Sequence, residues 1–331
     1  MKKCIYLIGL VLGGLFTSCG SADLLTYDQL VPAEISFPSD IRQIGVVNNM
    51  PLRKAASQED VPLAVVSAEG VYATEALAGE LADSKYFDQV IICDSALQTE
   101  EVDLNIDPKL SESEIQTLTR DLGVDLLVSL ERLWVQIAKK EVYYPGWEIP
   151  VPVIQSIITP VVRLYVSGRP QPMNTITFTD SLFWDLGTPV TEEMIVKESS
   201  KLAARKISSR LVPSWIPAER IYFSGGGGEM RDAAILMQEG SWQEAQNTWK
   251  GLYDRLRKGK TKSKAAYNIA LSYEMLGNIE EASQWVTKAL SQVPSGSQEE
   301  HIMKLYAEEL NRRLTEVVNL KVQMHRFNDN F

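Results

Sequence analysis

A six-residue pattern occurs twice in the last third of the chain. Residues 240–245 read Gly-Ser-Trp-Gln-Glu-Ala and residues 277–282 read Gly-Asn-Ile-Glu-Glu-Ala, an offset of 37 residues. Self-similarity at a period of this size is typical of helical repeats, in which each unit buries its apolar face only by stacking on a neighbour. The pattern therefore predicts two stacked helix pairs, over residues 230–257 and 263–294.

The second copy resembles the tetratricopeptide repeat, whose period is about 34 residues. The positions that carry the resemblance are Tyr267, Asn268, Ile269, Ala270, Tyr273, Gly277, Ala282, Ala289 and Pro294. The resemblance implies an all-α, tetratricopeptide-like domain over residues 230–327, with a concave face that binds an extended peptide. Transferred by position, that binding face consists of Lys264, Tyr267, Asn268, Leu271 and Glu274. Its mixed polarity leaves the charge of the ligand open.

Two repeats are too few to form a continuous core by themselves. The last stretch offers a long helix with an apolar residue at every fourth position, namely Ile302, Tyr306, Leu310, Leu314, Val318 and Val322. We expect this stripe to be core or capping surface, and the alternative is a helix that binds a partner. The Lys-rich run at 258–264 is interpreted as a solvated turn.

The region before the repeats, residues 38–223, alternates between strand and helix patterns. Strands are expected at 41–48, 87–93 and 125–138, helices at 71–83, 111–123 and 191–213, and an antiparallel hairpin at 160–185. This order predicts a mixed-sheet domain of the α/β or α+β class. Asp180 shares a face with apolar residues of the hairpin. It is expected at a bulge or sheet edge, and the alternative is a buried functional acid.

Two short stretches of this region carry a further resemblance. Leu122-Gly123-Val124-Asp125 and Ser84-Lys85-Tyr86-Phe87 resemble the small α/β domain shared by the Tol-system translocation protein and the curli-secretion lipoprotein. The domain is followed by four consecutive glycines within residues 224–229. Glu229 and Met230 follow them where a phosphate-binding loop would need Lys and Ser or Thr, so this segment is interpreted as a flexible linker.

An aromatic, proline-rich insertion spans residues 143–152. Its prolines exclude it from a central strand. The aromatic residues Tyr143, Tyr144 and Trp147 either cover a sheet face or remain exposed as a contact patch for a partner.

The N-terminus has the pattern of a secretory signal. Lys2 and Lys3 precede an apolar run from Ile5 to Phe16, which is too short to span a bilayer. The placement of Thr17 and Ser18 before Cys19 resembles the lipobox of bacterial lipoproteins. That resemblance implies a signal peptide over residues 1–18, diacylglycerol and a further acyl chain such as palmitate on Cys19, and a tether over residues 19–37. The alternative is an ordinary cleaved signal with a coincidental cysteine.

In that family, Gly20 rather than Asp after the lipidated cysteine favours the outer membrane. We therefore expect a lipid-anchored protein of the cell envelope, facing the periplasm.

Composition limits the chemistry that this chain can perform. The formal net charge of −10 over 331 residues disfavours nucleic acid and anionic lipid as general partners. The only histidines are His301 and His325, so the first three hundred residues offer no Ser-His-Asp or Cys-His arrangement and no His-based metal site. Cys93 is the only cysteine after Cys19, and it is expected to be a core thiol. We expect no catalytic residue, metal or cofactor.

The whole chain resembles an uncharacterised lipoprotein family of Bacteroidetes-type bacteria. The stretches that carry this resemblance are residues 30–35, 44–49 and 211–215. The leading hypothesis is a non-enzymatic scaffold that is held at the membrane through Cys19 and binds envelope protein partners. The alternatives are a small-ligand or glycan binder that uses the aromatic insertion and, third, a hydrolase with paired carboxylates.

Overall fold

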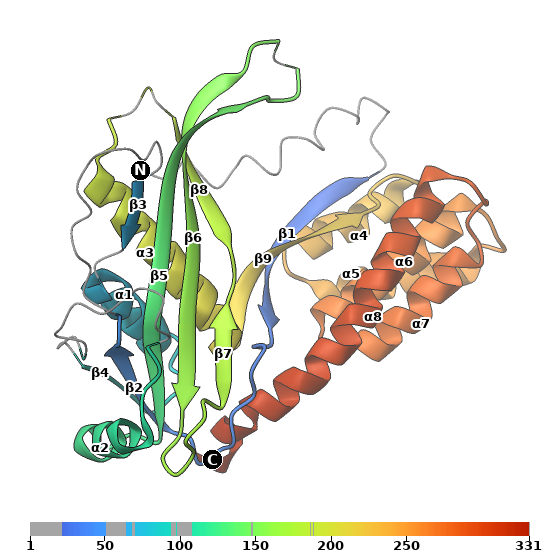
Figure 1. The fold of residues 1–331 in the computed structure, drawn as a ribbon. Coiled ribbons are helices and arrows are strands. Elements are labelled where there is room, and N and C mark those ends of the chain that lie inside the picture. Colours follow the sequence, from blue (N-terminus) through green and yellow to red (C-terminus); the bar gives the residue numbers. More distant parts are fainter. Residues whose placement is uncertain are drawn as a thin grey trace. The chain divides into compact units, whose positions relative to one another are not determined.

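The computed structural model describes residues 22–50, 64–67, 70–93, 97, 108–146, 148–185, 187 and 189–330. The chain divides into two compact units (Figure 1). The helical unit consists of Met1–Pro32 and Trp215–Val322, and the α/β unit consists of Ala33–Ser214 and Gln323–Phe331. The chain therefore passes from one unit to the other three times.

Among the described residues, a seven-stranded mixed sheet forms the α/β unit. Its main strand order is β4 (Gln89–Cys93), β2 (Gln43–Asn48), β5 (Leu126–Val142), β6 (Val151–Tyr165) and β7 (Asn174–Thr177). β3 (Ala64–Ser67) pairs with β5, and β8 (Asp180–Asp185) pairs with β6. β2 is parallel to β4 and β5, and the other pairs are antiparallel. The mixed sheet expected for this region is confirmed.

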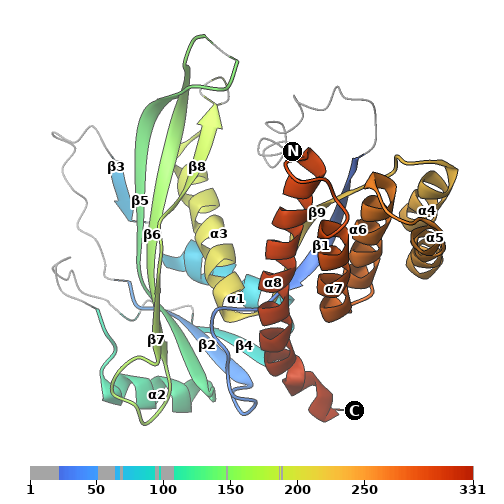
Figure 2. The same cartoon turned by 90° about the vertical axis from the view of Figure 1, so that its right-hand side faces the viewer.

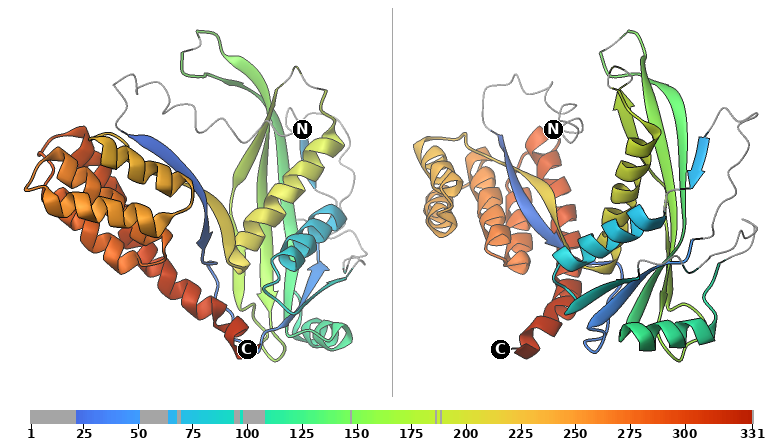
Figure 3. Two further views of the ribbon diagram at one scale, coloured as in Figure 1. Left: turned by 180° about the vertical axis from the view of Figure 1, so that it is seen from behind. Right: turned by 90° about the vertical axis from the view of Figure 1, so that its left-hand side faces the viewer.

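Helices cover both faces of this sheet (Figures 2 and 3). α1 (Gly70–Asp83) and α3 (Glu192–Leu211) pack together on one face, and α2 (Glu112–Leu122) packs on the other. β2 contributes to both layers, because Ile44 and Val46 join the core under α1 and α3 while Val47 joins the core under α2. A strand that is buried on both faces reads as a continuous apolar run, which explains the sequence of β2.

The expected helix ends are confirmed where the sequence has capping residues. Ser111 and Glu114 form a reciprocal capping box at the start of α2, and Gly123 ends that helix at φ 65°. Thr191 accepts a hydrogen bond from the Met194 N–H at the start of α3. These local signals set the helix limits because they satisfy backbone groups that the helix itself leaves without partners.

The described residues of the helical unit form five helices: α4 (Gly228–Gln238), α5 (Trp242–Arg255), α6 (Lys260–Met275), α7 (Ile279–Leu290) and α8 (Gln298–Met324). α4 packs against α5, α5 against α6, and α6 against α7. α8 continues into a 3-10 turn, η2 (His325–Asn330). The unit also contains a two-stranded sheet of β1 (Asp23–Val31) and β9 (Ser214–Tyr222).

Two expectations about segment roles need correction. Residues 23–31 form a strand, although the sequence suggests a tether over 19–37. Exposed and less exposed side chains alternate over part of this strand, but polar residues such as Gln29 occupy inner positions, so the sequence does not show the alternation. The apolar stripe of α8 is core only in part. Tyr306 and Leu310 are buried, whereas Val318 and Val322 are 60% and 64% exposed.

The last residues of the chain complete the α/β unit. The Gln323 carboxamide donates to Ala33 O at 3.0 Å and accepts from Ala33 N at 2.9 Å. The buried Arg326 guanidinium donates to three carbonyls, at 3.1 Å to Tyr86 O, 3.0 Å to Pro38 O and 2.9 Å to Ile41 O. It also lies 4.2 Å from the centroid of the Tyr86 ring. Buried carbonyls need donors, and here one side chain at the C-terminus supplies them.

We expect Arg326→Ala to destabilise the α/β unit by about 2–4 kcal/mol, because three carbonyls lose a charged donor. Hydrogen exchange of peptides from β2 and β4 in increasing urea measures the unfolding of this unit separately from the helical unit. Arg205→Ala, at an exposed position of α3, is the control and should change stability by less than about 0.5 kcal/mol. Equal stability of the two variants would contradict the role given to Arg326.

Candidate functional site

Five side chains at helical spacing define one side of α6, which we call the α6 face: Lys264, Tyr267, Asn268, Leu271 and Glu274. All five are buried. The open peptide-binding face expected at these positions is therefore not present in this structure. Segments of the same helical unit cover the α6 face, and the contacts below show how.

Asn268 holds the backbone of Phe223, the residue that follows β9. The Phe223 N–H donates to Asn268 Oδ1 at 2.9 Å, and Asn268 Nδ2 donates to Phe223 O at 2.7 Å. A single carboxamide thus satisfies both backbone groups of one residue, as a neighbouring strand would. Asn268 contacts only backbone groups of Phe223 in these two hydrogen bonds, so they do not depend on the phenylalanine side chain.

The ring of Phe223 lies between two other side chains of the α6 face. Its centroid is 5.1 Å from that of Tyr267 in an edge-on arrangement, and Lys264 Nζ is 5.1 Å from it. Tyr267 in turn lies 4.9 Å from the ring of Tyr306 on α8. Aromatic and cation–π contacts of this kind stabilise beyond the burial of area alone.

Arg220 of β9 forms a two-point ion pair with Glu274. Arg220 Nε lies 3.1 Å from Glu274 Oε2, and Arg220 Nη2 lies 2.7 Å from Glu274 Oε1. The two side chains are only 8% and 2% exposed. The paired geometry matters because a buried charge without a partner is strongly unfavourable.

Two tyrosine hydroxyls complete the surroundings of Glu274. Tyr306 donates to Glu274 Oε2 at 2.8 Å, and Tyr27 of β1 donates to Glu274 Oε1 at 3.1 Å. Burial raises the pKa of Tyr306 well above 10.0, and the adjacent Glu274 carboxylate adds to that rise. Burial and Glu274 raise the pKa of Tyr27 in the same direction. Both hydroxyls therefore remain protonated donors to the carboxylate.

The network continues from Arg220 to α8 and β1. Arg220 Nη2 donates to Glu309 Oε1 at 2.9 Å and to Gln29 Oε1 at 3.1 Å. Burial alone would raise the pKa of Glu309, but hydrogen bonds and charge from Arg312 and Arg220 outweigh it and lower that pKa. The carboxylate is thus kept charged. One guanidinium joins α6, α8, β1 and β9.

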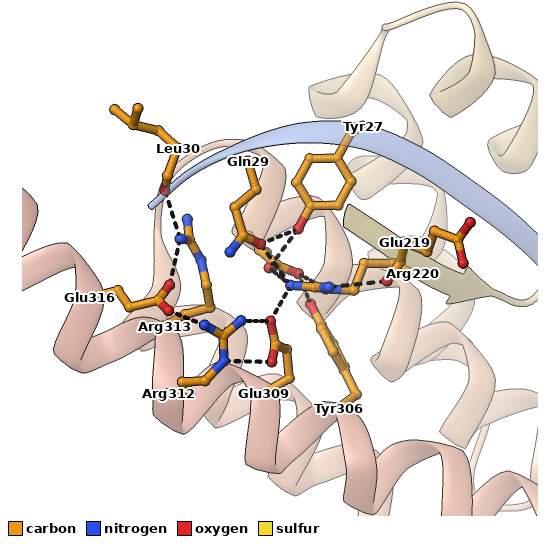
Figure 4. A network of polar contacts seen from close by, with 11 residues as sticks. Tyr27, Gln29, Leu30, Glu219, Arg220, Tyr306, Glu309, Arg312, Arg313 and Glu316 are labelled. Carbon is orange, nitrogen blue, oxygen red and sulfur yellow. Dashed lines mark hydrogen bonds and ion pairs between the residues drawn. The ribbon is translucent and has the colours of Figure 1, made fainter. Parts of the chain in front are cut away.

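A second strand contact ties β1 to α8. Arg313 Nη1 donates to Leu30 O at 3.1 Å and lies 2.9 Å from Glu316 Oε2 (Figure 4). β1 is therefore held by the carbonyl of Leu30 as well as by the side chains of Tyr27 and Gln29. These contacts, together with the pairing of β1 with β9, tie residues 23–31 to the helical unit.

The α6 face has the chemistry of peptide binding. Its groups recognise an extended backbone, an arginine and an aromatic ring, and the segment that they bind is residues 220–223 of the same chain. Among the described residues no group of three or more His, Cys, Asp or Glu is placed to hold a metal ion. His301 and His325 are both exposed and lie on α8 and η2.

Sequence reasoning missed Arg220, Tyr27 and Gln29. The alternation in β9 contained a usable signal, because Arg220 and Tyr222 share a strand face and both are buried. An arginine on the inner face of a strand needs an acid, and Glu274 had been placed on the α6 face from the repeat pattern. Nothing in the sequence, however, indicates that two segments 54 residues apart would pair.

The buried acid Glu131 was also missed. It lies at a bulge of β5, between Leu130 and Arg132, where the pairing with β6 shifts. It forms an ion pair with Arg163 and accepts a hydrogen bond from the Tyr165 hydroxyl at 2.5 Å. A buried acid with a charged partner and a hydroxyl donor is a satisfied structural group.

The remaining candidate residues are distributed over separate places. Tyr143 is 69% exposed and Tyr144 is half-buried, both between β5 and β6. Cys19 and Trp147 lie outside the described residues. Asp180 begins β8, where it lies 3.1 Å from Lys206 Nζ, so the expected edge position is confirmed.

We expect Glu274→Gln to destabilise the helical unit by about 2–4 kcal/mol, because the buried guanidinium of Arg220 then keeps only the half-buried Glu309 as its counter-charge. The double variant Arg220→Met, Glu274→Gln should lose clearly less than the sum of its two single variants. Urea unfolding followed by hydrogen exchange of α6 peptides measures both. The exposed pair Arg255 and Glu229 is the control, and its Glu229→Gln variant should cost at most about 1 kcal/mol. Additive effects of Arg220→Met and Glu274→Gln would contradict the coupling.

No helix in the described part of the chain has the length and apolar character needed to cross a membrane. No curated protein matches this chain. Two solved structures are similar at low level. A minor lipoprotein from Acinetobacter baumannii is 6% identical, with 52% of this chain and 95% of that chain covered and a TM-score of 0.24. The hypothetical protein CT253 from Chlamydia trachomatis is 10% identical, with 51% and 95% covered and a TM-score of 0.28.

Two families match the chain in sequence. "Domain of unknown function (DUF6340)" matches residues 231–312, and "Domain of unknown function (DUF8603)" matches residues 41–223. The two matches meet at the glycine segment expected as the boundary between residues 38–223 and 230–327. The compact units divide elsewhere, between Ser214 and Trp215, because β9 packs in the helical unit. The match to residues 41–223 covers more than half of the chain, so the chain belongs to the family described as Domain of unknown function (DUF8603).

Proposed function

We propose that this protein is a lipid-anchored protein of the cell envelope that acts as a non-enzymatic scaffold for other proteins. The lipobox-like residues before Cys19 support the anchor, and the outer membrane with the periplasmic face is the location that Gly20 favours. The observation that carries the scaffold function is an apolar tip on the β5–β6 hairpin of the α/β unit.

The tip consists of residues 143–146 and 148–150, which lie between two long strands. β5 and β6 pair continuously from Arg132 and Val161 to Val142 and Val151. β8 pairs with β6 only as far as Val153, so the last residue pairs between β5 and β6 extend beyond the end of β8 (Figure 1). The hairpin is thus a two-stranded arm with the tip at its end.

Two large side chains of the tip are presented to solvent. Tyr143 is 69% exposed and Ile149 is 75% exposed. An exposed tyrosine on a projecting element is the type of group that anchors protein interfaces, and Ile149 adds apolar contact area. The expectation that Tyr143 belongs to a contact patch therefore becomes part of this proposal, with Ile149 added to it.

The α6 face is a weaker candidate for the partner site. Its binding groups already hold residues 220–223, and its aromatic and polar members are buried in the core of the helical unit. A partner would have to replace the Arg220–Glu274 ion pair and the contacts of Phe223. The tip needs no such replacement.

A glycan or small-ligand binder is the second candidate. The exposed ring of Tyr143 favours it, because an aromatic face with a polar edge also suits stacking on a sugar. The experiment below distinguishes the two, because only a protein partner gives an adduct that mass spectrometry identifies as a second polypeptide.

We expect a photo-reactive amino acid at Glu148, an exposed position of the tip, to form a discrete protein adduct in cells. The pair of substitutions Tyr143→Ser and Ile149→Ser should remove that adduct, because both large contacts are lost. A photo-reactive residue at Gln171, which is exposed in the turn between β6 and β7, is the positional control and should form no such adduct. Mass spectrometry of the adducts is the measurement.

An adduct that survives the double substitution, or no protein adduct at Glu148, would contradict the scaffold proposal. The second result, together with retention on an immobilised glycan that requires Tyr143, would support the second candidate. Cys19→Ser in the same cells tests the anchor and should abolish incorporation of labelled palmitate. Continued labelling would exclude Cys19 as the attachment site.

A further inference from the structure

The strongest concentration of charge in this acidic chain lies between α5 and α6. Residues 255–264 contain six basic side chains and no acidic one, although the net charge of the whole chain is −10. Arg255 is paired with Glu229, and Lys264 is buried on the α6 face. The other basic residues of the run are Arg257, Lys258, Lys260 and Lys262. We call these four residues the basic turn.

Three members of the basic turn point into solvent. Arg257, Lys258 and Lys260 are exposed, and Lys262 is half-buried. Lys260 Nζ lies 3.9 Å from Glu299 Oε1, and its side chain is still 60% exposed. Lys262 donates to Leu256 O at 2.7 Å and lies 4.2 Å from the ring centroid of Tyr253, which fixes the shape of the turn. The cluster is therefore a preformed patch of positive charge.

The basic turn lies at the same end of the helical unit as the start of β1. A Cβ atom on Gly226 would lie 3.2 Å from Thr261 Cγ2, so the glycine segment passes directly beside the start of α6. Two residues earlier, the Ser224 hydroxyl donates a hydrogen bond to the carboxylate of Asp23, the first residue of β1. A short path of direct contacts thus connects Asp23 to the turn.

This position becomes important because β1 begins close to Cys19. Four residue steps separate Cys19 from Asp23, and a fully extended chain covers at most about 14 Å in four steps. A lipid on Cys19 would therefore hold the Asp23 end of the helical unit within about that distance of the bilayer surface. The long tether expected from the sequence would not impose such a limit.

We propose that the basic turn binds the anionic phospholipid headgroups of the bilayer that holds the anchor. This inference rests on the lipidation of Cys19 given under the proposed function. Stable membrane attachment generally combines a lipid with a second signal, and a basic patch is one such signal. Each lysine or arginine near an anionic surface strengthens binding about fivefold, so three exposed charges give an effect of about 100-fold. The patch would also orient the helical unit on the surface.

The test uses residues 20–331, which retain every described residue and lack the anchor, so that headgroup binding is measured by itself. Co-sedimentation is compared for vesicles of phosphatidylcholine alone and vesicles with one quarter phosphatidylglycerol. We expect binding only to the vesicles that contain phosphatidylglycerol, and its loss when sodium chloride rises from 50 to 300 mM. The variant Arg257→Gln, Lys258→Gln, Lys260→Gln should bind those vesicles about 100-fold more weakly.

A control variant removes the same charge elsewhere: Arg169→Gln, Arg205→Gln, Lys321→Gln, all at exposed positions. It should bind like the parent protein. The proposal is overturned if the parent does not bind the anionic vesicles, if the turn variant binds them equally well, or if the control loses as much binding. Binding to an acidic polyglutamate peptide without vesicle binding would show that the turn contacts an acidic protein instead, which also overturns it.

Palmitate labelling of Cys19 separates this inference from the proposed function. A labelled protein whose turn does not bind anionic vesicles keeps the anchor and loses only the headgroup site. An unlabelled protein loses the anchor, whatever the vesicles show.

Discussion

The buried ion pair between Arg220 and Glu274 is the interaction on which the helical unit depends. The helix pairs α4–α5 and α6–α7 do not form this core alone, because two strands and α8 contribute to it as well. The guanidinium of Arg220 contacts α6 and α8 directly and reaches β1 through Gln29. An arginine serves this role because its planar fork offers several donors at fixed angles. A lysine would satisfy fewer of these partners.

The occupied α6 face changes where function is expected. Side chains that could bind a peptide instead hold Arg220 and Phe223, so they contribute to stability. The surfaces proposed here for partners are the exposed tip with Tyr143 and Ile149 and the charged turn between α5 and α6. Both are at the ends of elements, where side chains can contact a partner without disturbing a core.

Local rules predicted the helices and the central strands well, because their signals are short-range. The Ser111–Glu114 capping box and the apolar run of β2 are examples. Pairing between distant segments was not predictable: β1 is polar enough to resemble a tether, and its partners lie on β9, α6 and α8. The repeat pattern placed the residues of the α6 face correctly on one helix side, yet it contained no information on what covers them. The burial of that face depends on tertiary contacts with β1, β9 and α8.

Hydrogen–deuterium exchange of β1 and β9 tests the central claim most directly. If the strands belong to the core of the helical unit, their amides should exchange about as slowly as those of α6, and so should the amide of Phe223, which follows β9 and is bonded to Asn268. Glu274→Gln should speed the exchange of β1, β9 and α6 together. Fast exchange of both strands beside a protected α6 would show that the helices fold without them, and it would contradict the account.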